Sequence, residues 1–120
     1  MAKVPDIRVK RVYEPEADSD GVRILIDRLW PRGVSKTELK LDAWMKDVAP
    51  GTELRKWFDH DPAKWAEFRS RYDEELDANP AAVEALRGKI GKGPATLLYG
   101  AKDETHNQAV ALKDYLARRR

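Results

Sequence analysis

The chain has 120 residues, of which 42% are hydrophobic and 37% charged, and this length suits one folded domain over residues 1–120 with a single core. It contains no cysteine, which excludes disulfides, thiolate metal ligands and the thiol chemistry of rhodanese-type enzymes and cysteine phosphatases. The net charge of +2 comes from 23 basic and 21 acidic residues mixed along the chain, so nothing in it requires a nucleic-acid partner.

The ends of the chain carry little functional information. No apolar run approaches the roughly 20 residues of a transmembrane helix, and the first residues, MAKVPD, lack the apolar region of a signal peptide. We therefore expect a cytoplasmic location and no membrane partner. The last three residues, Arg118 to Arg120, form a run of like charge that more often marks a solvated helix end than a binding surface.

Two strands are expected in the first part of the chain. Residues 7–13 (IRVKRVY) alternate apolar and basic side chains, as in a half-buried strand near a sheet edge. Residues 22–26 (VRILI) are almost wholly apolar, which is typical of a strand buried on both faces of a parallel sheet. The loop between them, residues 14–21, is short enough to favour an antiparallel pair, so the orientation of the first strand stays open.

Helices are expected through the middle of the chain. A capping-box pattern over residues 35–38 indicates a short helix start, and residues 41–48 place apolar side chains at helical spacing. Residues 52–58 fit another short helix. Residues 62–78 form the clearest amphipathic helix, and residues 80–90 form the next.

The last part of the chain predicts one more strand and one more helix. Residues 94–101 (PATLLYGA) form the second fully apolar strand, and a capping box of Thr105 and Gln108 precedes a final helix. Two buried strands separated by helices are most simply parallel neighbours joined by a right-handed crossover. The sequence therefore predicts a small three-layer α/β domain with a short, mostly parallel sheet of about three strands flanked by helices.

Charged, polar and aromatic residues follow both apolar strands where these end. They are Asp27, Arg28, Trp30, Arg32, Lys102, Asp103, His106 and Asn107. Parallel strands bring their carboxyl ends to one edge, where open α/β sheets bind ligands. The start of the final helix would add free amides and a partial positive charge. We therefore predict a site for a small anionic molecule, with Arg28, Arg32 and Lys102 as its cations.

The reaction, if there is one, is not identified by these residues. In a catalytic site, His106 or Asp27 would act as the acid or base, although a structural role for His106 is about as common. His60 and His106 could form a metal site with Asp59, Asp61 or Asp103, but no spacing matches a known metal motif. We therefore predict no metal and no particular cofactor, and whether the protein is an enzyme stays open.

A second class of function has some support in the sequence. Residues 54–58 (LRKWF), with Trp44 and Lys46 upstream, mix cations and aromatic rings as surfaces that bind nucleic acid do. At helical spacing such aromatic residues more often belong to the core. The alternative is therefore a nucleic-acid or protein interaction module without catalysis, and the balanced charge disfavours nucleic acid. The oligomeric state is not indicated.

Three motifs together resemble the bacterial YeaO-like proteins, the short branch of a domain-of-unknown-function family. The motifs are DRLWPRG at 27–33, LRKWFDHD at 54–61 and LLYGAKDETHN at 97–107, and the resemblance extends from Ile7 to Leu116. It implies a small cytoplasmic α/β domain and no established reaction, cofactor or substrate. Its motif positions complete the set of expected ligand-binding residues, which are Arg28, Trp30, Arg32, Lys46, Arg55, His60, Lys102, Asp103 and Asn107.

Overall fold

The computed structural model describes residues 6–118 as a four-stranded sheet with four α-helices. The strands have the order β1-β4-β2-β3, and each neighbouring pair is parallel. The predicted α/β fold class is therefore confirmed, with four strands in place of about three. The elements are β1 (Ile7–Arg11), η1 (Asp18–Asp20), β2 (Val22–Leu25), β3 (Ala43–Trp44), η2 (Lys46–Val48), α1 (Thr52–Phe58), η3 (Pro62–Lys64), α2 (Trp65–Asp77), α3 (Pro80–Ile90), β4 (Ala95–Tyr99) and α4 (Gln108–Arg118), where η marks a 3-10 helix.

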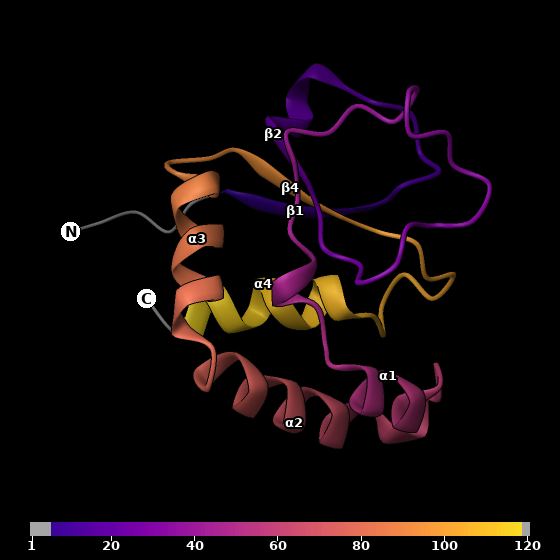
Figure 1. Ribbon diagram of the computed structural model, residues 1–120, viewed down its shortest axis with the longest axis vertical. Helices are drawn as coiled ribbons and strands as arrows, with labels where there is room; N and C mark the ends of the chain where they lie inside the picture. Colours follow the sequence, from indigo (N-terminus) through magenta and orange to yellow (C-terminus); the bar gives the residue numbers. More distant parts are fainter. Residues whose placement is uncertain (1–5, 119–120) are drawn as a thin grey trace.

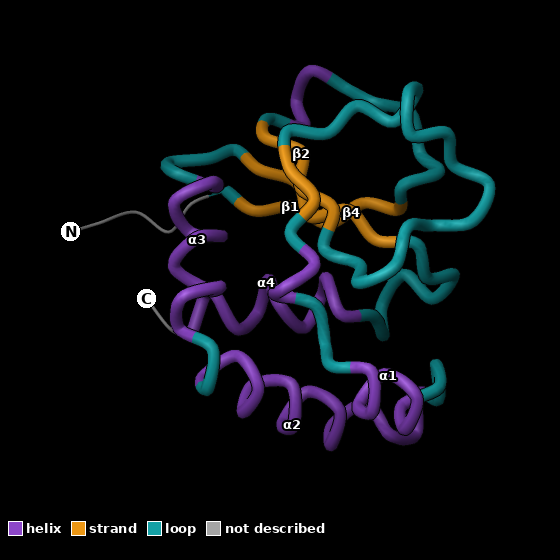
Figure 2. Tube along the Cα trace, viewed as in Figure 1, coloured by secondary structure: helices purple, strands orange, loops and turns teal. Residues whose placement is uncertain are grey.

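The sheet has a different cover on each face. The α-helices lie together on one side of it (Figure 1), where Ile24 and Leu97 belong to the same core cluster as Phe68 and Leu112. On the other face Leu25 packs with apolar residues of the segment that follows β2. Figure 2 shows that this segment consists of loop. The three layers are therefore helices, sheet and loop.

The orientation of β1, which the sequence left open, is parallel. β1 is an edge strand and pairs in parallel with β4, with Ile7 opposite Ala95. It does not pair with β2, because β4 lies between them. Residues 12–21 therefore lead from the end of β1 to the start of a strand two positions away. A short connection favours antiparallel strands only when the two strands are direct partners.

The helix predicted over residues 41–48 does not form. The chain makes the short strand β3 and the 3-10 helix η2 there. Ala43 and Met45 pack against the core on the helix side of the sheet, whereas Trp44 between them packs against the opposite face. This alternation is that of a strand. The prediction was wrong because a few apolar residues at spacings of three and four also fit a strand that is covered on both faces.

The two predicted capping boxes also do not form. After Ser35 the chain makes only one turn, in which the amide of Leu39 donates to the Ser35 carbonyl at 3.0 Å. Before α4, the side-chain oxygen of Asn107 caps the helix by accepting from the amide of Val110 at 3.0 Å. Asparagine is a stronger N-cap residue than threonine. The start of α4 is therefore set by Asn107, and the side chain of Gln108 is left for another contact.

A buried group of charges fixes the turn before β2. Asp20 and Arg23 are each only 4% exposed. The carboxylate of Asp20 accepts hydrogen bonds from the Arg23 guanidinium and from Nζ of Lys10, the latter at 2.9 Å. Burial acts to raise the pKa of Asp20, but the hydrogen bonds from Lys10, Ala17 and Arg23 outweigh it and hold this pKa below its ordinary value. Since these charges are paired within the fold, we assign them a structural role.

The described part of the chain bears on two expectations about membrane-spanning helices and the basic run at the end of the sequence. Across residues 6–118, no helix has the length and apolar character needed to cross a membrane. Arg118 forms ion pairs with Asp73 and Asp114. The other two residues of the predicted basic run, 119 and 120, lie outside the described residues, as do residues 1–5.

Candidate functional site

A cavity of about 460 Å³ opens where the parallel strands end. β2 and β4 are direct neighbours, with Leu25 opposite Leu98, so the segments that follow them meet at one edge of the sheet. Tyr13 after β1 lines the same cavity, and Phe68 of α2 lines it from the helix layer. The geometric basis of the predicted site, two parallel strands with adjacent carboxyl ends, is therefore present.

The structure brings most of the predicted site residues to this cavity, but not all of them. Those that line it are Asp27, Arg28, Trp30, Arg32, Arg55, His60 and Asn107. Lys102 and Asp103 line an adjoining hollow, which shares His60, Gly100 and Ala101 with the main cavity. Lys46 and His106 line neither of the two.

Asp27 is held in the cavity wall through both carboxylate oxygens. Oδ2 accepts from the amide of Gly100, at the end of β4, at 2.8 Å, and Oδ1 accepts from the side-chain amide of Gln108 in α4. Burial raises the pKa of Asp27 to about 6, against the opposing effect of these hydrogen bonds and of the positive charge of Arg55. Asp27 is therefore mostly ionised at neutral pH and takes up a proton under mildly acidic conditions.

Three arginines, Arg28, Arg32 and Arg55, bring positive charge to the cavity. The guanidinium of Arg28 is oriented by hydrogen bonds from Nε to the Pro50 carbonyl and from Nη2 to the Ala49 carbonyl, each at 3.2 Å. Neither bond uses Nη1. The Nε of Arg55, in α1, is buried and has no hydrogen-bond partner among residues 6–118. A buried donor left unpaired costs roughly 1 to 3 kcal/mol. Arg55 as a residue lines the cavity, to which it brings its positive charge.

His60 reaches the cavity through an unusual backbone path. Asp59 and His60 follow α1 with φ angles of 45° and 55°, which is the left-handed region. That region costs residues other than glycine roughly 1 to 2 kcal/mol each. The path places the His60 ring 6.5 Å from the ring of Phe58 and at the boundary between the cavity and the adjoining hollow. Backbone strain of this kind occurs often at binding sites.

Aromatic and apolar side chains form much of the cavity wall. Phe58 and Phe68 stack with their ring centroids 4.2 Å apart, and both are almost fully buried. Trp30 lines the cavity and meets Trp44 edge to face. Leu29, by contrast, is 60% exposed although it is a large apolar side chain. The wall therefore combines a buried aromatic pair with apolar surface that is open to solvent.

His106 is committed to the turn before α4. Oδ1 of Asp103 accepts from the amides of Thr105 and His106 at 2.9 Å, and its Oδ2 lies 3.0 Å from Nδ1 of His106. The hydrogen bonds from Thr105 and His106 hold the pKa of Asp103 below its usual range. These bonds use amides that we expected to be free for an anion. Of the two predicted acid or base residues, only Asp27 lies at the cavity.

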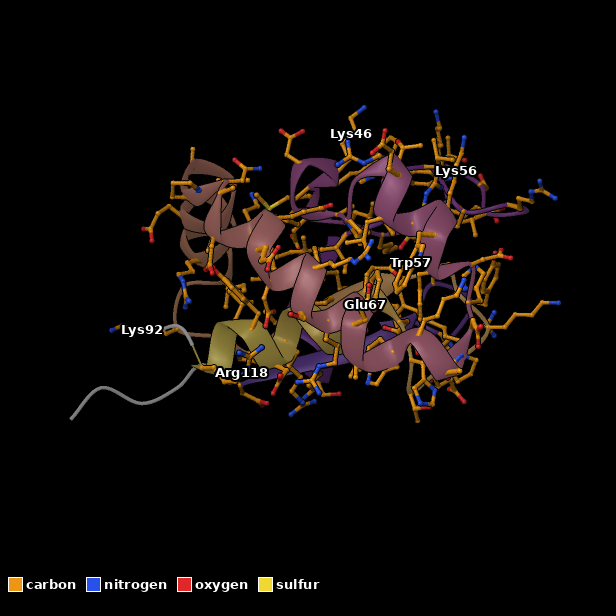
Figure 3. The ribbon with its side chains drawn as sticks, turned by 90° about the horizontal axis from the view of Figure 1, so that it is seen from below. Lys46, Lys56, Trp57, Glu67, Lys92 and Arg118 are labelled. Atoms are coloured by element: carbon orange, nitrogen blue, oxygen red, sulfur yellow. The ribbon has the colours of Figure 1, made fainter. Side chains whose placement is uncertain are left out.

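The two predicted lysines lie on the outer surface. Nζ of Lys46 lies 4.7 Å from the ring centroid of Trp44, and Figure 3 shows its side chain pointing away from the body of the protein. Lys102 is exposed beside the adjoining hollow. Neither lysine therefore lines the main cavity, where Arg28, Arg32 and Arg55 supply the positive charge.

The aromatic and basic residues of α1 do not share one face. Arg55 lines the cavity, whereas Lys56 points outward from α1 and Trp57 lies between α1 and α2 (Figure 3). The ring of Trp57 already contacts two cations, since Lys64 and Arg71 lie 5.2 and 4.3 Å from its centroid. A nucleic-acid surface of the kind predicted from this segment would need these side chains side by side and open to solvent.

The two histidines are used separately. The metal site weighed from the sequence combined His60 and His106 with Asp59, Asp61 or Asp103. Within residues 6–118, no group of three or more histidine, aspartate or glutamate side chains is arranged to hold a metal ion. His60 lines the cavity, and His106 bonds to Asp103.

Sequence reasoning missed several residues that shape the site. Gln108 orients Asp27, Gly100 supplies the amide that binds it, and Phe58 and Phe68 form the buried wall. The two phenylalanines carried no signal, because an apolar residue that faces a cavity has the same spacing as one that faces the core. For Gln108 a signal existed: Asn107 is the better N-cap residue, which would have freed Gln108 for another role.

Comparisons with known proteins place the chain among proteins of unknown function. A family model described as the inactive DUF488-N3 subclade matches residues 6–120. Uncharacterized protein YeaO of Escherichia coli is 49% identical over 111 residues, which cover 92% of this chain and 96% of that protein. Uncharacterized protein Mb3100c of Mycobacterium bovis and Uncharacterized protein Rv3073c of Mycobacterium tuberculosis are each 40% identical over 116 residues, which cover 97% of this chain and 98% of theirs. No solved structure matches the chain.

Proposed function

Because the chain belongs to the inactive DUF488-N3 subclade, together with YeaO-like proteins of unknown function, we propose that it binds a small anionic molecule without converting it. The binding site is the cavity at the carboxyl edge of the sheet. A cytoplasmic location, expected from the sequence, is part of the same proposal.

The observation that carries this proposal is that three arginines, Arg28, Arg32 and Arg55, line one cavity. An anionic oxygen in the cavity would accept from their guanidinium groups in charge-assisted hydrogen bonds, which are roughly twice as strong as neutral ones. The free amides expected at the start of α4 no longer support the proposal, because Asp103 and Asn107 use them.

Two further features support a small ligand. Arg28 is pre-oriented by the Ala49 and Pro50 carbonyls, so little side-chain freedom is lost when it binds. The cavity volume of about 460 Å³ is typical of small-molecule sites and leaves no room for a folded macromolecule.

Binding without conversion is favoured over catalysis. The family description calls the subclade inactive. His106, the predicted general base, is held by Asp103 outside the cavity. Asp27 remains in the cavity, where hydrogen bonds from Gly100 and Gln108 fix the plane of its carboxylate. We therefore assign Asp27 a role in ligand recognition.

Replacing Arg55 with glutamine should weaken anion binding at least about tenfold, because a charge-assisted bond to the ligand is lost. The measurement is isothermal titration calorimetry of the full chain with acetate, benzoate, phenyl phosphate and inorganic phosphate. Lys56→Gln is the matched control, since it removes the same charge from the next residue of α1 but on the outer side. It should leave affinity within about twofold.

Two outcomes would contradict the proposed function. One is that none of these anions binds to the wild-type protein at millimolar concentration. The other is that Arg55→Gln and Lys56→Gln have the same affinity for every anion that binds. Far-ultraviolet circular dichroism of both variants shows whether either change has altered the fold.

A further inference from the structure

We propose that the ligand is an aromatic carboxylate that also carries an N–H donor, with the carboxylate at Arg55, the donor at Asp27 and the ring against the aromatic wall. This inference rests on the proposed anion site and names the class of molecule that the same cavity would take. An aminobenzoate is the simplest member of that class.

The aromatic component follows from the cavity wall. Phe58, Phe68 and Trp30 all line the cavity, and Phe58 and Phe68 present a stacked pair. Aromatic rings prefer offset-stacked or edge-to-face neighbours, which a ligand ring can supply and a compact inorganic anion cannot. Tyr13 is 47% exposed and Leu29 is 60% exposed, so a ring would also cover apolar surface that now faces water.

The donor follows from the position of Asp27 in a site for an anion. The carboxylate of Asp27 lines the same cavity as Arg28 and Arg55, so an anion bound by these arginines lies near a second negative charge. A simple anion would be repelled by it. A ligand N–H directed at Asp27 turns this repulsion into a hydrogen bond.

Asp27 has the capacity for this additional bond. An ionised carboxylate can accept about four hydrogen bonds, and its two oxygens receive one each from Gly100 and Gln108. Those two bonds fix the plane of the carboxylate, so its remaining acceptor positions have a defined direction. The pair of Arg55 and Asp27 therefore recognises a molecule with an acid at one position and a donor at another.

The test compares acetate, benzoate, 3-aminobenzoate and 4-aminobenzoate at about pH 7.5, where Asp27 is ionised. Each of these molecules carries one negative charge at that pH. For the wild-type chain we expect benzoate to bind at least about tenfold more tightly than acetate, and the better aminobenzoate about tenfold more tightly than benzoate. Equal affinities for acetate and benzoate would overturn the aromatic part of the inference.

Asp27→Asn tests the role of the carboxylate charge. Benzoate should bind this variant more tightly than it binds the wild type, because the repulsion is gone, and the preference for the aminobenzoate should fall below about threefold. A second measurement needs no variant. At about pH 5.5 the wild-type preference for the aminobenzoate over benzoate should also become smaller, because Asp27 is then largely protonated. For this comparison each affinity is calculated from the concentration of the ionised ligand.

The possible failures are distinguishable. If benzoate binds and depends on Arg55 but neither aminobenzoate binds more tightly, the donor is wrong and the anion site stands. If the preference for an aminobenzoate is unchanged in Asp27→Asn and at the lower pH, Asp27 is not its acceptor, which also overturns the inference. If none of the anions binds, the proposed function fails together with this inference.

Discussion

Gly21→Ala is expected to lower the free energy of unfolding by about 3 to 5 kcal/mol, a large part of the stability of a typical domain. Gly21 has φ 66° and ψ −136°, a conformation that is almost restricted to glycine. A Cβ atom at this position would lie 2.0 Å from the carbonyl oxygen of Pro94. The same carbonyl accepts from the amide of Val22 at 3.1 Å at the start of the β2 and β4 pair, so it cannot move freely.

Gly33→Ala is the matched control for this change. Gly33 also has a positive φ, 73°, but a Cβ atom there would meet nothing within 4 Å. We expect this control to cost only about 1 kcal/mol, from backbone strain alone. Urea denaturation of both variants measures the difference. If Gly21→Ala were no more destabilising than Gly33→Ala, the close approach of the chain at Pro94 would not restrict position 21.

Asp27→Asn is expected to remove a pH dependence of stability worth about 2 kcal/mol between about pH 4.5 and 7.5. The pKa of Asp27 is raised from 3.8 to about 6 in the folded protein. The folded state therefore holds its proton more tightly than the unfolded state does. The resulting stabilisation is fully present below the unfolded pKa and is lost as the pH rises through about 6.

The measurement is urea denaturation of wild-type protein and variant at both pH values. Relative to the wild type, the variant should gain stability at the higher pH, because asparagine carries no buried charge. In the variant, one of the two oxygens that accept from Gly100 and Gln108 becomes an NH₂ group. The Gln108 side-chain amide can rotate so that its oxygen accepts from this NH₂ group. Asp47→Asn, at an exposed position, should keep the wild-type pH trend. A wild-type trend in Asp27→Asn as well would mean that Asp27 is not the responsible group.

Much of the fold could be predicted from local patterns. The apolar run before Asp27 identified β2, and the run before Gly100 identified β4, because strands covered on both faces need apolar side chains at consecutive positions. The helix expected over residues 52–58 has the bounds of α1, and that expected over residues 80–90 has the bounds of α3. The orientation of β1 could not be predicted, because it depends on β4, which lies more than 80 residues further along the chain.

Whether a predicted residue lines the cavity depends on the long-range contacts that its side chain makes, and these are not visible in the sequence. Asp27, Arg28 and Arg32 line the cavity because they follow β2 within a few residues, which keeps them near the carboxyl edge of the sheet. His106 does not, because Asp103 offers its amide and its ring nearby partners, and no sequence pattern decides between such a turn and an exposed histidine. Arg55 was implied by the resemblance alone, since from its helical position it could equally have faced solvent.

The sheet is covered by helices on one face and by loop on the other, and this difference bears on how a ligand reaches the cavity. The segment after β2 that covers one face is loop, and it also carries Asp27, Leu29 and Trp30. Such segments open locally at a much lower free energy than the packed helices and central strands. We therefore expect a molecule to enter and leave on the side of this segment, while the helical layer stays packed on the sheet. The residence time of a ligand would then depend on the rate of local opening of this segment and not on the rate at which the whole chain unfolds.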